Sequence, residues 1–363
     1  MKRYRAGILG ATGMVGQRLV TLLAGHPWFE VTALAASAQS AGQPYRQAVA
    51  GRWQMPDPIP PAVGDINVMD AMDLQAVAQE ADLVFCAVSL DKASTRALEE
   101  AYARLEVAVI SNNSACRGIR DVPMLIPEIN PEHARVIPAQ RKRLGTQRGF
   151  IAVKPNCSIQ SYVPALTPLR DFGIRAITAC TYQAVSGAGK TLDNWPQMQG
   201  NIIPYIAGEE EKSEQEPLKI WGSLSPDADA ILPGKYPVIS AQCVRVPVSD
   251  GHLAAVSVKF DKKPTREEIL ARWRNNETLP QKLQLPSAPV PFLRYLSQED
   301  RPQPLLDREA GNGMAVVIGR LREDPVMDWR FVCLSHNTLR GAAGGSVLTA
   351  ELLCAQGYIL HRE

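Results

Sequence analysis

The sequence has little net charge and no long uninterrupted apolar run. Its 39 Lys and Arg residues against 37 Asp and Glu residues leave a formal charge of +2, which is too small to favour binding to nucleic acid or an anionic membrane. The apolar stretch within MKRYRAGILGATG breaks at glycines within a few residues. It therefore predicts neither a signal peptide nor a membrane span.

A paired cysteine motif is also missing. The 7 cysteines are scattered from Cys86 to Cys354 without a CxxC pair, which argues against a disulfide framework or a zinc cluster and favours a reducing compartment. We expect a cytoplasmic protein without a bound metal. Its 363 residues are too many for one comfortable core, so we expect two domains.

The beginning of the chain reads as strand, glycine turn, helix and strand. An apolar run, Ala6–Leu9, precedes a GxxGxxG turn, and Val31–Leu34 forms the next strand. This spacing differs from the commoner GxGxxG, but the flanking strand and helix favour a dinucleotide site over a plain tight turn. The pyrophosphate would face the helix N-terminus. The expected cofactor contacts on this turn are Gly10, Thr12, Gly13, Met14, Val15 and Gly16.

An acidic residue is missing at the end of the second expected strand, where the chain reads LAASAQSAG. An NAD site usually has Asp or Glu there to bind the ribose 2′-hydroxyl. A carboxylate would repel a 2′-phosphate, whereas Ser37, Ser40 and backbone N–H groups would accept one. NADP(H) is therefore favoured, although no arginine supports the phosphate and use of both cofactors stays open.

Two further runs, DLVFCAVS and VAVISNNS, are continuously apolar, as expected for parallel strands covered on both faces. Each ends in small polar residues at the carboxyl edge where ligands bind, and we expect Ser89 and Asn113 to contact the cofactor there. INPEHARVI predicts another helix, with Asn130 as N-cap and Pro131 at its first position.

The second half of the chain changes pattern. ITACTYQAVS, LAAVSVKF and MAVVIGRL resemble strands, with loops rich in proline and charge between them. This predicts a mixed or antiparallel sheet with helices on one face, an α+β domain. RGAAGGSVLTAELLCAQGY predicts an amphipathic helix that packs back on the first domain. We expect domains at 1–156 and 157–340, with 341–363 completing the first.

The stretch AVSGAGKT fits a permissive phosphate-loop pattern. Pro196 stands where the helix of such a loop should continue, and no apolar strand ends in an aspartate suited to magnesium. We interpret the stretch as a loop whose backbone, with Ser186 and Gly187, contacts the nicotinamide end of a dinucleotide. A flexible glycine loop is the alternative.

Cys157, in VKPNCSIQ, lies where an apolar strand ends and a helix could begin. Backbone N–H groups point outward at such a junction, which favours a thiolate. Pro164 and Pro168 keep any following helix short or kinked, so the contribution of its dipole is modest. The other cysteines in apolar runs are interpreted as inert: Cys86, Cys180, Cys333 and Cys354.

Several motifs occur in a fixed order along nearly the whole chain: the glycine turn, SNNSACR, PNCS, TYQAVSGAG, GEEEK, CVRVPVSDGH and HNTLRGAAGG. Together they resemble the aspartate-β-semialdehyde dehydrogenase family, particularly its archaeal and fungal branch. The resemblance implies a Rossmann domain, a mixed-sheet catalytic and dimerisation domain, and a homodimer or homotetramer. It also implies NADPH-dependent reductive dephosphorylation of L-4-aspartyl phosphate through a cysteine thioester, in the biosynthesis of lysine, threonine, methionine and isoleucine.

The same resemblance implies roles for individual residues. Cys157 would be the nucleophile and His252 the general acid and base, with a pKa near neutrality. His336 is the rival candidate. The expected substrate and cofactor contacts are Gln183 on the acyl carbonyl, Arg245 on the α-carboxylate, Glu209 on the ammonium, Lys212 and Arg117 on phosphate, Asn156 beside the substrate, and Asn337 and the glycines after Arg340 on the nicotinamide side.

Three alternatives stay open. GEEEKSEQE is often a solvated helix face, which would leave Glu209 and Lys212 without a role. The scaffold also resembles malonyl-CoA reductase and, more distantly in chemistry, N-acetylglutamyl-phosphate reductase, neither of which needs Glu209 for an ammonium. A dinucleotide-binding sensor without turnover would explain the glycine turn, but not Cys157, Arg245 and His252 together.

Overall fold

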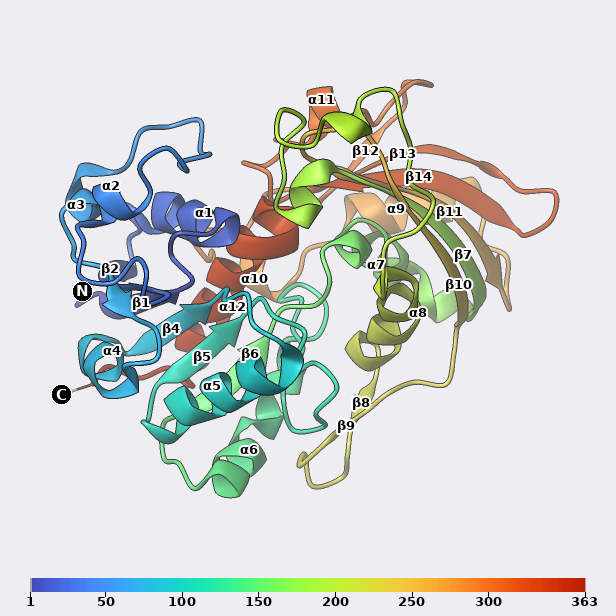
Figure 1. Cartoon of the computed structure of the whole chain (residues 1–363). Helices are drawn as coiled ribbons and strands as arrows, with labels where there is room; N and C mark the ends of the chain where they lie inside the picture. Colours follow the sequence, from blue (N-terminus) through green and yellow to red (C-terminus); the bar gives the residue numbers. More distant parts are fainter. Residues whose placement is uncertain (1, 363) are drawn as a thin grey trace.

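A computed structural model describes residues 2–362, which form two six-stranded sheets (Figure 1). The first sheet has the order β3-β2-β1-β4-β5-β6, and all of its pairs are parallel. This is the Rossmann order, so the predicted fold is confirmed for this half. The strands are β1 (Tyr4–Leu9), β2 (Phe29–Ala36), β3 (Met69–Asp70), β4 (Leu83–Cys86), β5 (Ala108–Ser111) and β6 (Phe150–Val153).

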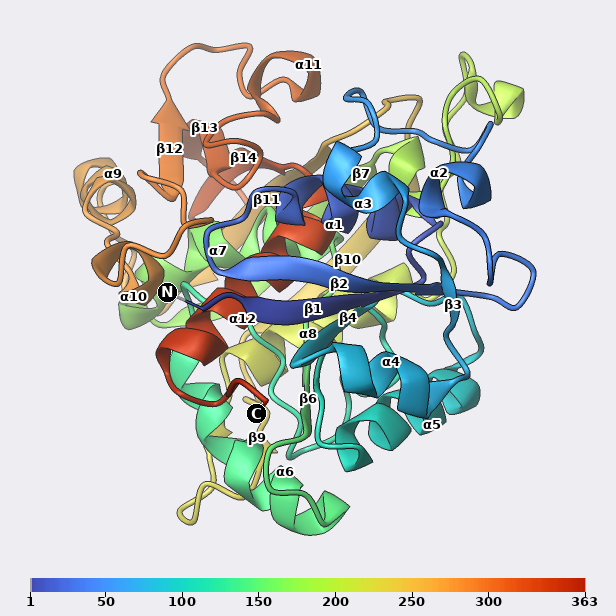
Figure 2. The same cartoon turned by 90° about the vertical axis from the view of Figure 1, so that its left-hand side faces the viewer.

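Helices cover both faces of this sheet (Figure 2). On one face, α1 (Met14–Leu23) and α12 (Gly344–Ala355) pack on Ile8, Leu34 and Phe85. On the other, α4 (Leu74–Glu80) and α5 (Lys92–Arg104) pack on Leu9 and Val84. Strands β4, β5 and β6 are consequently buried along their whole length, which explains their continuous apolar sequence. The remaining elements of this part are α2 (Tyr45–Ala48), α3 (Pro61–Gly64), η1 (Pro131–Val136) and α6 (Ile137–Leu144).

The second sheet is mixed, as the sequence predicts. Its order is β10-β7-β11-β14-β13-β12, with parallel pairs at the two edges and antiparallel pairs between them. Buried and more exposed positions alternate along β7 and β11, because one face is covered by the helices α7 (Val163–Leu166), α8 (Glu209–Ile220) and α9 (Arg266–Arg274) (Figure 1). The strands are β7 (Ile174–Gln183), β10 (Val238–Arg245), β11 (His252–Phe260), β12 (Leu293–Leu296), β13 (Val316–Glu323) and β14 (Trp329–Ser335).

Short helical segments connect these strands. In the described part of the chain between β6 and α12, only α8 (Glu209–Ile220) and α9 (Arg266–Arg274) are longer than two turns. The others are η2 (Ser158–Gln160), α7 (Val163–Leu166), η3 (Thr167–Phe172), η4 (Val185–Ala188), η5 (Pro196–Met198), α10 (Leu279–Lys282), α11 (Pro304–Asp307) and the π-helical η6 (Leu339–Ala343), with a small β8 (Ser223–Leu224) and β9 (Ile231–Leu232) hairpin. No helix of residues 2–362 is long and apolar enough to cross a membrane.

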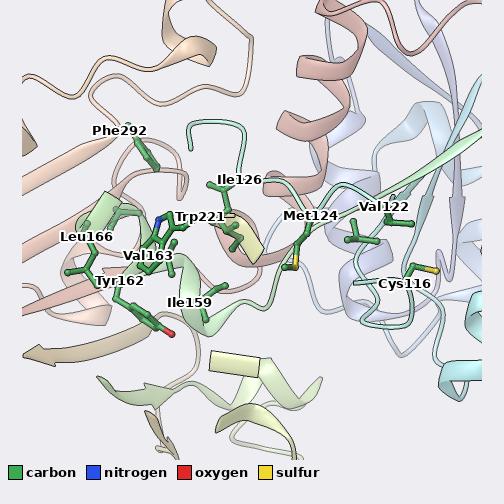
Figure 3. Close-up of a cluster of buried hydrophobic side chains, with 14 of the residues drawn as sticks. Cys116, Val122, Met124, Ile126, Ile159, Tyr162, Val163, Leu166, Trp221 and Phe292 are labelled. Atoms are coloured by element: carbon green, nitrogen blue, oxygen red, sulfur yellow. The ribbon is translucent and has the colours of Figure 1, made fainter. Parts of the chain in front are cut away.

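One hydrophobic cluster runs through both halves of the molecule (Figure 3). It extends from Cys116 and Val122, near the first sheet, through Met124 and Ile126, to the side chains packed under the second sheet. The latter include Ile159, Tyr162, Val163, Leu166, Trp221 and Phe292. The two halves are therefore packed against each other through apolar side chains.

Of two local predictions, one holds in part and one is wrong. Asn130 stands at the N-cap position of η1, with Pro131 next as expected, but its side chain makes no capping bond: it accepts from Ile126 N–H and donates to Met124 O, both at 2.9 Å. The C-terminal helix α12 is not amphipathic, because Gly344–Leu353 are all buried. Its polar side chains are paired inside the protein instead. Ser346 bonds the Asn112 side chain at 3.0 Å, and Glu351 bonds His26 at 2.9 Å.

A buried ion pair joins the segment before α12 to the first half. Arg340, in the π-helix η6, donates to Glu128 at 2.6 Å, and both side chains are almost completely buried. The guanidinium also lies 4.7 Å from the ring centroid of Phe292. The pair holds η6 between the two sheets, directly before α12.

We expect Glu128→Gln to destabilise the protein by about 3–5 kcal/mol, since it leaves the Arg340 charge buried and unpaired. The free energy of unfolding from urea titration measures this. Glu323→Gln is the matched control, because the Glu323–Lys263 pair is exposed and should contribute less than about 1 kcal/mol. Equal losses in the two variants would contradict the role of the buried pair.

Candidate active site

A cavity of about 470 Å³ opens between the carboxyl edge of the first sheet and the ends of β7 and β10. Many predicted site residues line it: Val15, Arg117, Asn156, Cys157, Gln183, Ser186, Gly187, Glu209, Arg245 and Asn337. Gly341, one of the glycines expected on the nicotinamide side, also lines it. Sequence reasoning missed other lining residues, among them Asn112, Lys154, Ile206, Ala207 and Thr338. Both halves of the chain thus contribute to one site.

Cys157 follows β6 by a short extended segment and directly precedes η2. Its Sγ lies 3.5 Å from Nε2 of His252, the first residue of β11. On the opposite side is Gly341, where an added Cβ would lie 2.8 Å from the Cβ of Cys157. Only glycine allows η6 to approach the cysteine this closely.

The His252 ring is oriented by the backbone. Its Nδ1 accepts a hydrogen bond from Ala184 N–H at 3.1 Å, so the neutral ring that fits this geometry carries its proton on Nε2, toward Sγ. Burial, and then the nearby Arg245 charge, hold the pKa of His252 well below its usual value. The predicted pKa near neutrality is therefore wrong for the free protein, in which the imidazole is a neutral hydrogen-bond donor.

The expectation of a favoured thiolate is also wrong for the free protein. Burial, and secondly the Glu209 carboxylate, raise the pKa of the Cys157 thiol, while Lys154, Arg117 and Arg245 oppose this rise. The segment after Cys157 is a three-residue 3₁₀ turn, which is too short to provide an appreciable helix dipole. Cys157 consequently rests as a thiol at neutral pH.

Helix α8 directs two carboxylates into the site from one face. Glu209 accepts from Asn156 Nδ2 at 2.9 and 3.0 Å. Glu216, seven residues on, accepts from the Asn156 backbone N–H at 2.6 Å and from Arg117 at 2.8 Å. Both side chains are buried, so the solvated-face alternative is wrong for Glu209. The helical spacing of Glu209 and Glu216 was the signal that could have identified Glu216.

A buried lysine on the same helix supports the loop of Arg117. Lys219 Nζ donates to the carbonyls of Arg117, Ile119 and Val122 at 2.7, 2.7 and 2.9 Å. Burial lowers the pKa of Lys219 to about 8. The ammonium fixes the path of this loop and hence the position of the Arg117 backbone.

Arg245 and Gln183 lie side by side as register partners on β10 and β7. Arg245 donates to Ala184 O at 2.7 Å, and Gln183 Nε2 lies 3.4 Å from a Glu209 oxygen. Lys212 is not among the residues that line the cavity, but its ammonium pairs at 2.8 Å with Glu209, which does line it. The expected role of Lys212 with Arg117 in binding phosphate stays a prediction.

His336, the rival catalytic histidine, is turned away from the cysteine. Its Nδ1 accepts from Thr338 and Leu339 N–H at 3.3 Å, and its Nε2 lies 3.4 Å from Glu309. Asn337, the next residue, donates to Ser186 Oγ at 2.8 Å and accepts from Gly251 N–H at 2.8 Å. This geometry places His252, and not His336, at the sulfur.

A second cavity of about 390 Å³ lies at the glycine turn. Gly10 has a φ of +83°, and an added Cβ would lie 2.4 Å from Ala87 O. A Cβ on Gly16 would lie 2.2 Å from Gly10 O, so the turn and α1 can pack only with glycines. The predicted residues that line the cavity are Gly10, Thr12, Gly13, Ser37 and Ser89. Such a narrow, backbone-lined turn at the start of a helix fits a dinucleotide.

Four predicted cofactor residues do not line either cavity: Met14, Gly16, Ser40 and Asn113. Ser40 is buried and closes a turn on Ser37 O at 2.9 Å. Asn113 Nδ2 points to Cys86 Sγ and to Glu99, both at 3.4 Å. Sequence reasoning also missed Asp70, at the end of β3, which lines the second cavity. Within the described part of the chain, no Lys or Arg lines this cavity.

Comparisons with known proteins agree with this arrangement. Residues 5–137 match the family model "Semialdehyde dehydrogenase, NAD binding domain", and residues 166–340 match "Semialdehyde dehydrogenase, dimerisation domain". The chain is 43% identical to the aspartate-semialdehyde dehydrogenase of Archaeoglobus fulgidus, over 98% of this chain and 100% of the relative. It is 42% identical to that of Saccharomyces cerevisiae, over 98% of each chain.

A solved structure is also similar over nearly the full length. It is the aspartate semialdehyde dehydrogenase with NADP from Candida albicans, which has a TM-score of 0.88 and 39% sequence identity, covering 99% of this chain and 100% of the other. The similarity includes both sheets and the segments that carry the two cavities.

We expect Glu209→Gln to increase the reactivity of Cys157 at neutral pH. The Glu209 charge helps to raise the pKa of the thiol, so its removal lowers that pKa and increases the thiolate fraction at pH 8. Iodoacetamide labelling of Cys157, followed by peptide mass spectrometry as a function of pH, measures the change, which we expect to be several-fold.

Glu211→Gln is the matched control, because Glu211 is an exposed carboxylate two positions along the same helix. It should leave the labelling profile unchanged. A Glu209→Gln profile that coincides with the parent or moves to higher pH would contradict the electrostatic assignment.

Proposed function

The chain belongs to the aspartate-semialdehyde dehydrogenase family, and we propose that it catalyses the reversible, NADPH-dependent reductive dephosphorylation of L-4-aspartyl phosphate to L-aspartate 4-semialdehyde. This reaction serves the biosynthesis of lysine, threonine, methionine and isoleucine. The observation that carries the proposal is the Cys157–His252 contact of 3.5 Å in a cavity that also presents Arg245 and Glu209.

Cys157 acts as the nucleophile. Its sulfur forms a bond to the acyl carbon, the bond from that carbon to the phosphate oxygen breaks, and phosphate leaves with the electron pair. The product on the protein is a thioester. The thiol proton passes to the departing phosphate, so hydrogen phosphate is the second product. Neutral His252 donates its Nε2–H as a hydrogen bond to the sulfur as thiolate character develops, and to the substrate oxygen in the later step, and it keeps that proton.

The thiol proton leaves only when substrate is bound, because the free site disfavours charge on both Cys157 and His252. Substrate brings an ammonium close to Glu209, which neutralises the carboxylate that raises the pKa of the cysteine. Binding and activation of the nucleophile are thereby coupled.

Recognition of the substrate uses the remaining polar groups of the cavity. Arg245 suits the α-carboxylate, since a guanidinium offers two parallel donors. Glu209 suits the ammonium, and Gln183 beside it can donate to the acyl carbonyl. A malonyl-CoA substrate would offer no ammonium to the buried Glu209, so its reduction is the less favourable alternative.

The residues around the glycine turn are suited to hold NADP(H). The Gly10–Gly16 turn and the N-terminus of α1 would receive the pyrophosphate, with Ser37 and Ser89 beside the adenosine half. When bound, NADPH supplies the two electrons and the hydrogen that reduce the thioester carbonyl. The nicotinamide half would extend past Val15 toward Ser186, Asn337 and Gly341, which line the cavity of Cys157.

We also propose that the protein forms a homodimer or homotetramer and that it lies in the cytoplasm. The match of residues 166–340 to a dimerisation domain supports association of two copies. The less covered face of the second sheet is hollowed between β7, β10, β11 and β14, where Arg322 and Arg330 line a cavity of about 470 Å³. This face is the part of the domain suited to a partner subunit.

Replacing Cys157 by Ser should abolish turnover, a loss on the order of a thousandfold or more, because the hydroxyl is a far weaker nucleophile at neutral pH. Absorbance at 340 nm with NADP, phosphate and aspartate semialdehyde measures the rate. Cys180→Ser, in β7, is the control and should retain activity. NADPH binding should persist in both variants, and substantial turnover by Cys157→Ser would refute the covalent mechanism.

NADP should bind more tightly than NAD, because no acid follows β2 at Ser37 to hold a free 2′-hydroxyl. Fluorescence titration of both cofactors measures the preference, and Ser37→Asp should shift it toward NAD. A preference of the parent for NAD by roughly tenfold or more would overturn this assignment.

A further inference from the structure

His336 is a buried side chain that the proposed chemistry does not use. It directly follows β14, whose last residue, Ser335, is the register partner of His252, and only 2% of it is exposed. A buried histidine needs a hydrogen-bond partner at each ring nitrogen. The two nitrogens of His336 find their partners on two separate segments of the chain, and these segments indicate what the side chain does.

The first nitrogen caps the π-helix η6. Nδ1 of His336 accepts from the backbone N–H groups of Thr338 and Leu339 at 3.3 Å each, and the Thr338 hydroxyl also lies 3.3 Å from it. The first N–H groups of a helix have no acceptor within the helix, and Thr338, at the N-cap position, makes no capping bond with its own side chain. The imidazole therefore provides the acceptor that a capping side chain would otherwise supply.

The second nitrogen faces a carboxylate from another segment. Nε2 of His336 lies 3.4 Å from Oε1 of Glu309, which follows α11. The hydrogen bond from His336 holds the pKa of Glu309 below its usual value, so the carboxylate is charged at neutral pH and accepts. Because Nδ1 is already an acceptor, the neutral ring carries its proton on Nε2, and Glu309 stabilises this tautomer.

Glu309 also reaches the turn before His252. Its carboxylate lies 3.4 Å from Nε of Arg308, and the Arg308 guanidinium donates to the carbonyl of Asp250 at 3.2 Å. One exposed carboxylate thus contacts both the ring that caps η6 and the arginine that bonds the Asp250 turn.

The segment that His336 caps lies against the nucleophile. Gly341 N–H donates to the carbonyl of His336 at 2.9 Å, which closes the π turn, and a Cβ added to Gly341 would lie 2.8 Å from the Cβ of Cys157. Asn337, between the ring and η6, accepts from the N–H of Gly251 at 2.8 Å. The position of this segment therefore bears on the surroundings of both Cys157 and the strand end that carries the catalytic imidazole.

We propose that His336 is a positioning residue for the proposed reaction: its Nδ1 caps η6, and Glu309 fixes the tautomer in which Nδ1 can accept. The segment held in this way keeps Gly341 packed against Cys157. His336 acts through η6 and exchanges no proton with the substrate or the sulfur. The inference rests on the proposed function for its kinetic consequences, whereas its effect on Cys157 is a property of the free protein.

Two substitutions replace the ring nitrogens separately. In His336→Asn the amide oxygen can take the place of Nδ1 and keep the cap, since Asn is among the preferred capping residues. In His336→Gln the longer side chain carries its amide toward the place of Nε2 and leaves the first N–H groups of η6 without an acceptor. His336→Leu removes both functions.

The first measurement is the steady-state oxidation of aspartate semialdehyde at 340 nm with NADP and phosphate. We expect kcat to fall about tenfold or more in His336→Gln and His336→Leu, and to stay within about threefold of the parent in His336→Asn. The KM for semialdehyde should stay within about twofold in all three, because Arg245 and Glu209 lie on β10 and α8 and not on η6.

The second measurement needs no turnover. Iodoacetamide labelling of Cys157, read by peptide mass spectrometry, should become several-fold faster in His336→Gln, because a loosened η6 no longer shields the side of the cysteine that Gly341 covers. His336→Asn should label at the parental rate. Glu309→Ala should change both measurements in the same direction but less, whereas Glu299→Ala, at an exposed carboxylate before α11, is the control and should match the parent.

The inference is overturned if His336→Gln keeps the parental kcat and labelling rate, or if His336→Asn is as impaired as His336→Gln. A lower melting temperature with unchanged kcat and labelling, measured well below the transition, would show that the cap is only structural and would also count against it. Glu309→Ala keeps the test decisive if the His336 variants do not fold, because its side chain lies at the surface: parental kinetics and labelling in that variant contradict the role of the pair.

The proposed function and this inference fail separately. A parent that does not oxidise aspartate semialdehyde with NADP and phosphate refutes the proposed reaction. The labelling of Cys157 still decides whether His336 positions the segment beside the cysteine.

Discussion

The arrangement of the site depends on the hydrogen bonds between the carboxylates of α8 and Asn156. Glu209 accepts from the amide of Asn156 and Glu216 accepts from its backbone N–H, while the amide oxygen accepts from Ser158 N–H and Oγ–H at 2.7 Å each. The residue before the nucleophile is therefore held at every polar atom except its carbonyl. Two buried carboxylates are costly, and Arg117 and Lys212 offset that cost by pairing with them.

This network determines the electrostatics of the cysteine. Because Cys157 is buried and, secondly, because the Glu209 carboxylate lies near it, the pKa of the thiol is raised and the free protein favours the thiol. Because His252 is buried beside Arg245, its pKa is lowered and its ring is neutral. The cavity has cationic side chains that suit the anionic groups of a substrate and a carboxylate that suits an ammonium. Such a distribution favours a zwitterionic substrate with an additional anion over a neutral one, which connects the geometry to the proposed chemistry.

The site also depends on how the two halves meet. The π-helix η6 presents Gly341 to Cys157 and Arg340 to Glu128, and α12 continues from it onto the first sheet. A π turn widens the helix locally and is frequent at functional sites. Here one continuous segment contacts Cys157, forms the ion pair with Glu128 and packs on the Rossmann core, so the C-terminal segment links the two halves of the molecule at the cavity.

The sequence by itself determined the features that depend on neighbours along the chain. The β1–α1–β2 unit, the buried strands β4 and β5, the mixed second sheet and the strand-end position of Cys157 follow from periodicity, glycine spacing and apolar runs, which are local. The two-residue strand β3 is too short to show any period, and α12 resembled an amphipathic helix because burial of its polar residues requires partners such as His26, far away in the sequence.

Only the tertiary structure decided how the charges are paired and which groups face the cavity. Glu216 reaches Arg117 across 99 positions and Asn156 across 60, and no local pattern encodes such contacts. The pKa shifts of Cys157 and His252 follow from burial and from charges on other elements, so the shift of Cys157 is opposite to the local expectation and that of His252 departs from it. Lys154 lines the cavity without a carboxylate at salt-bridge distance among residues 2–362, whereas Lys212 pairs with Glu209, and the sequence does not distinguish them because desolvation and distance are properties of the folded chain.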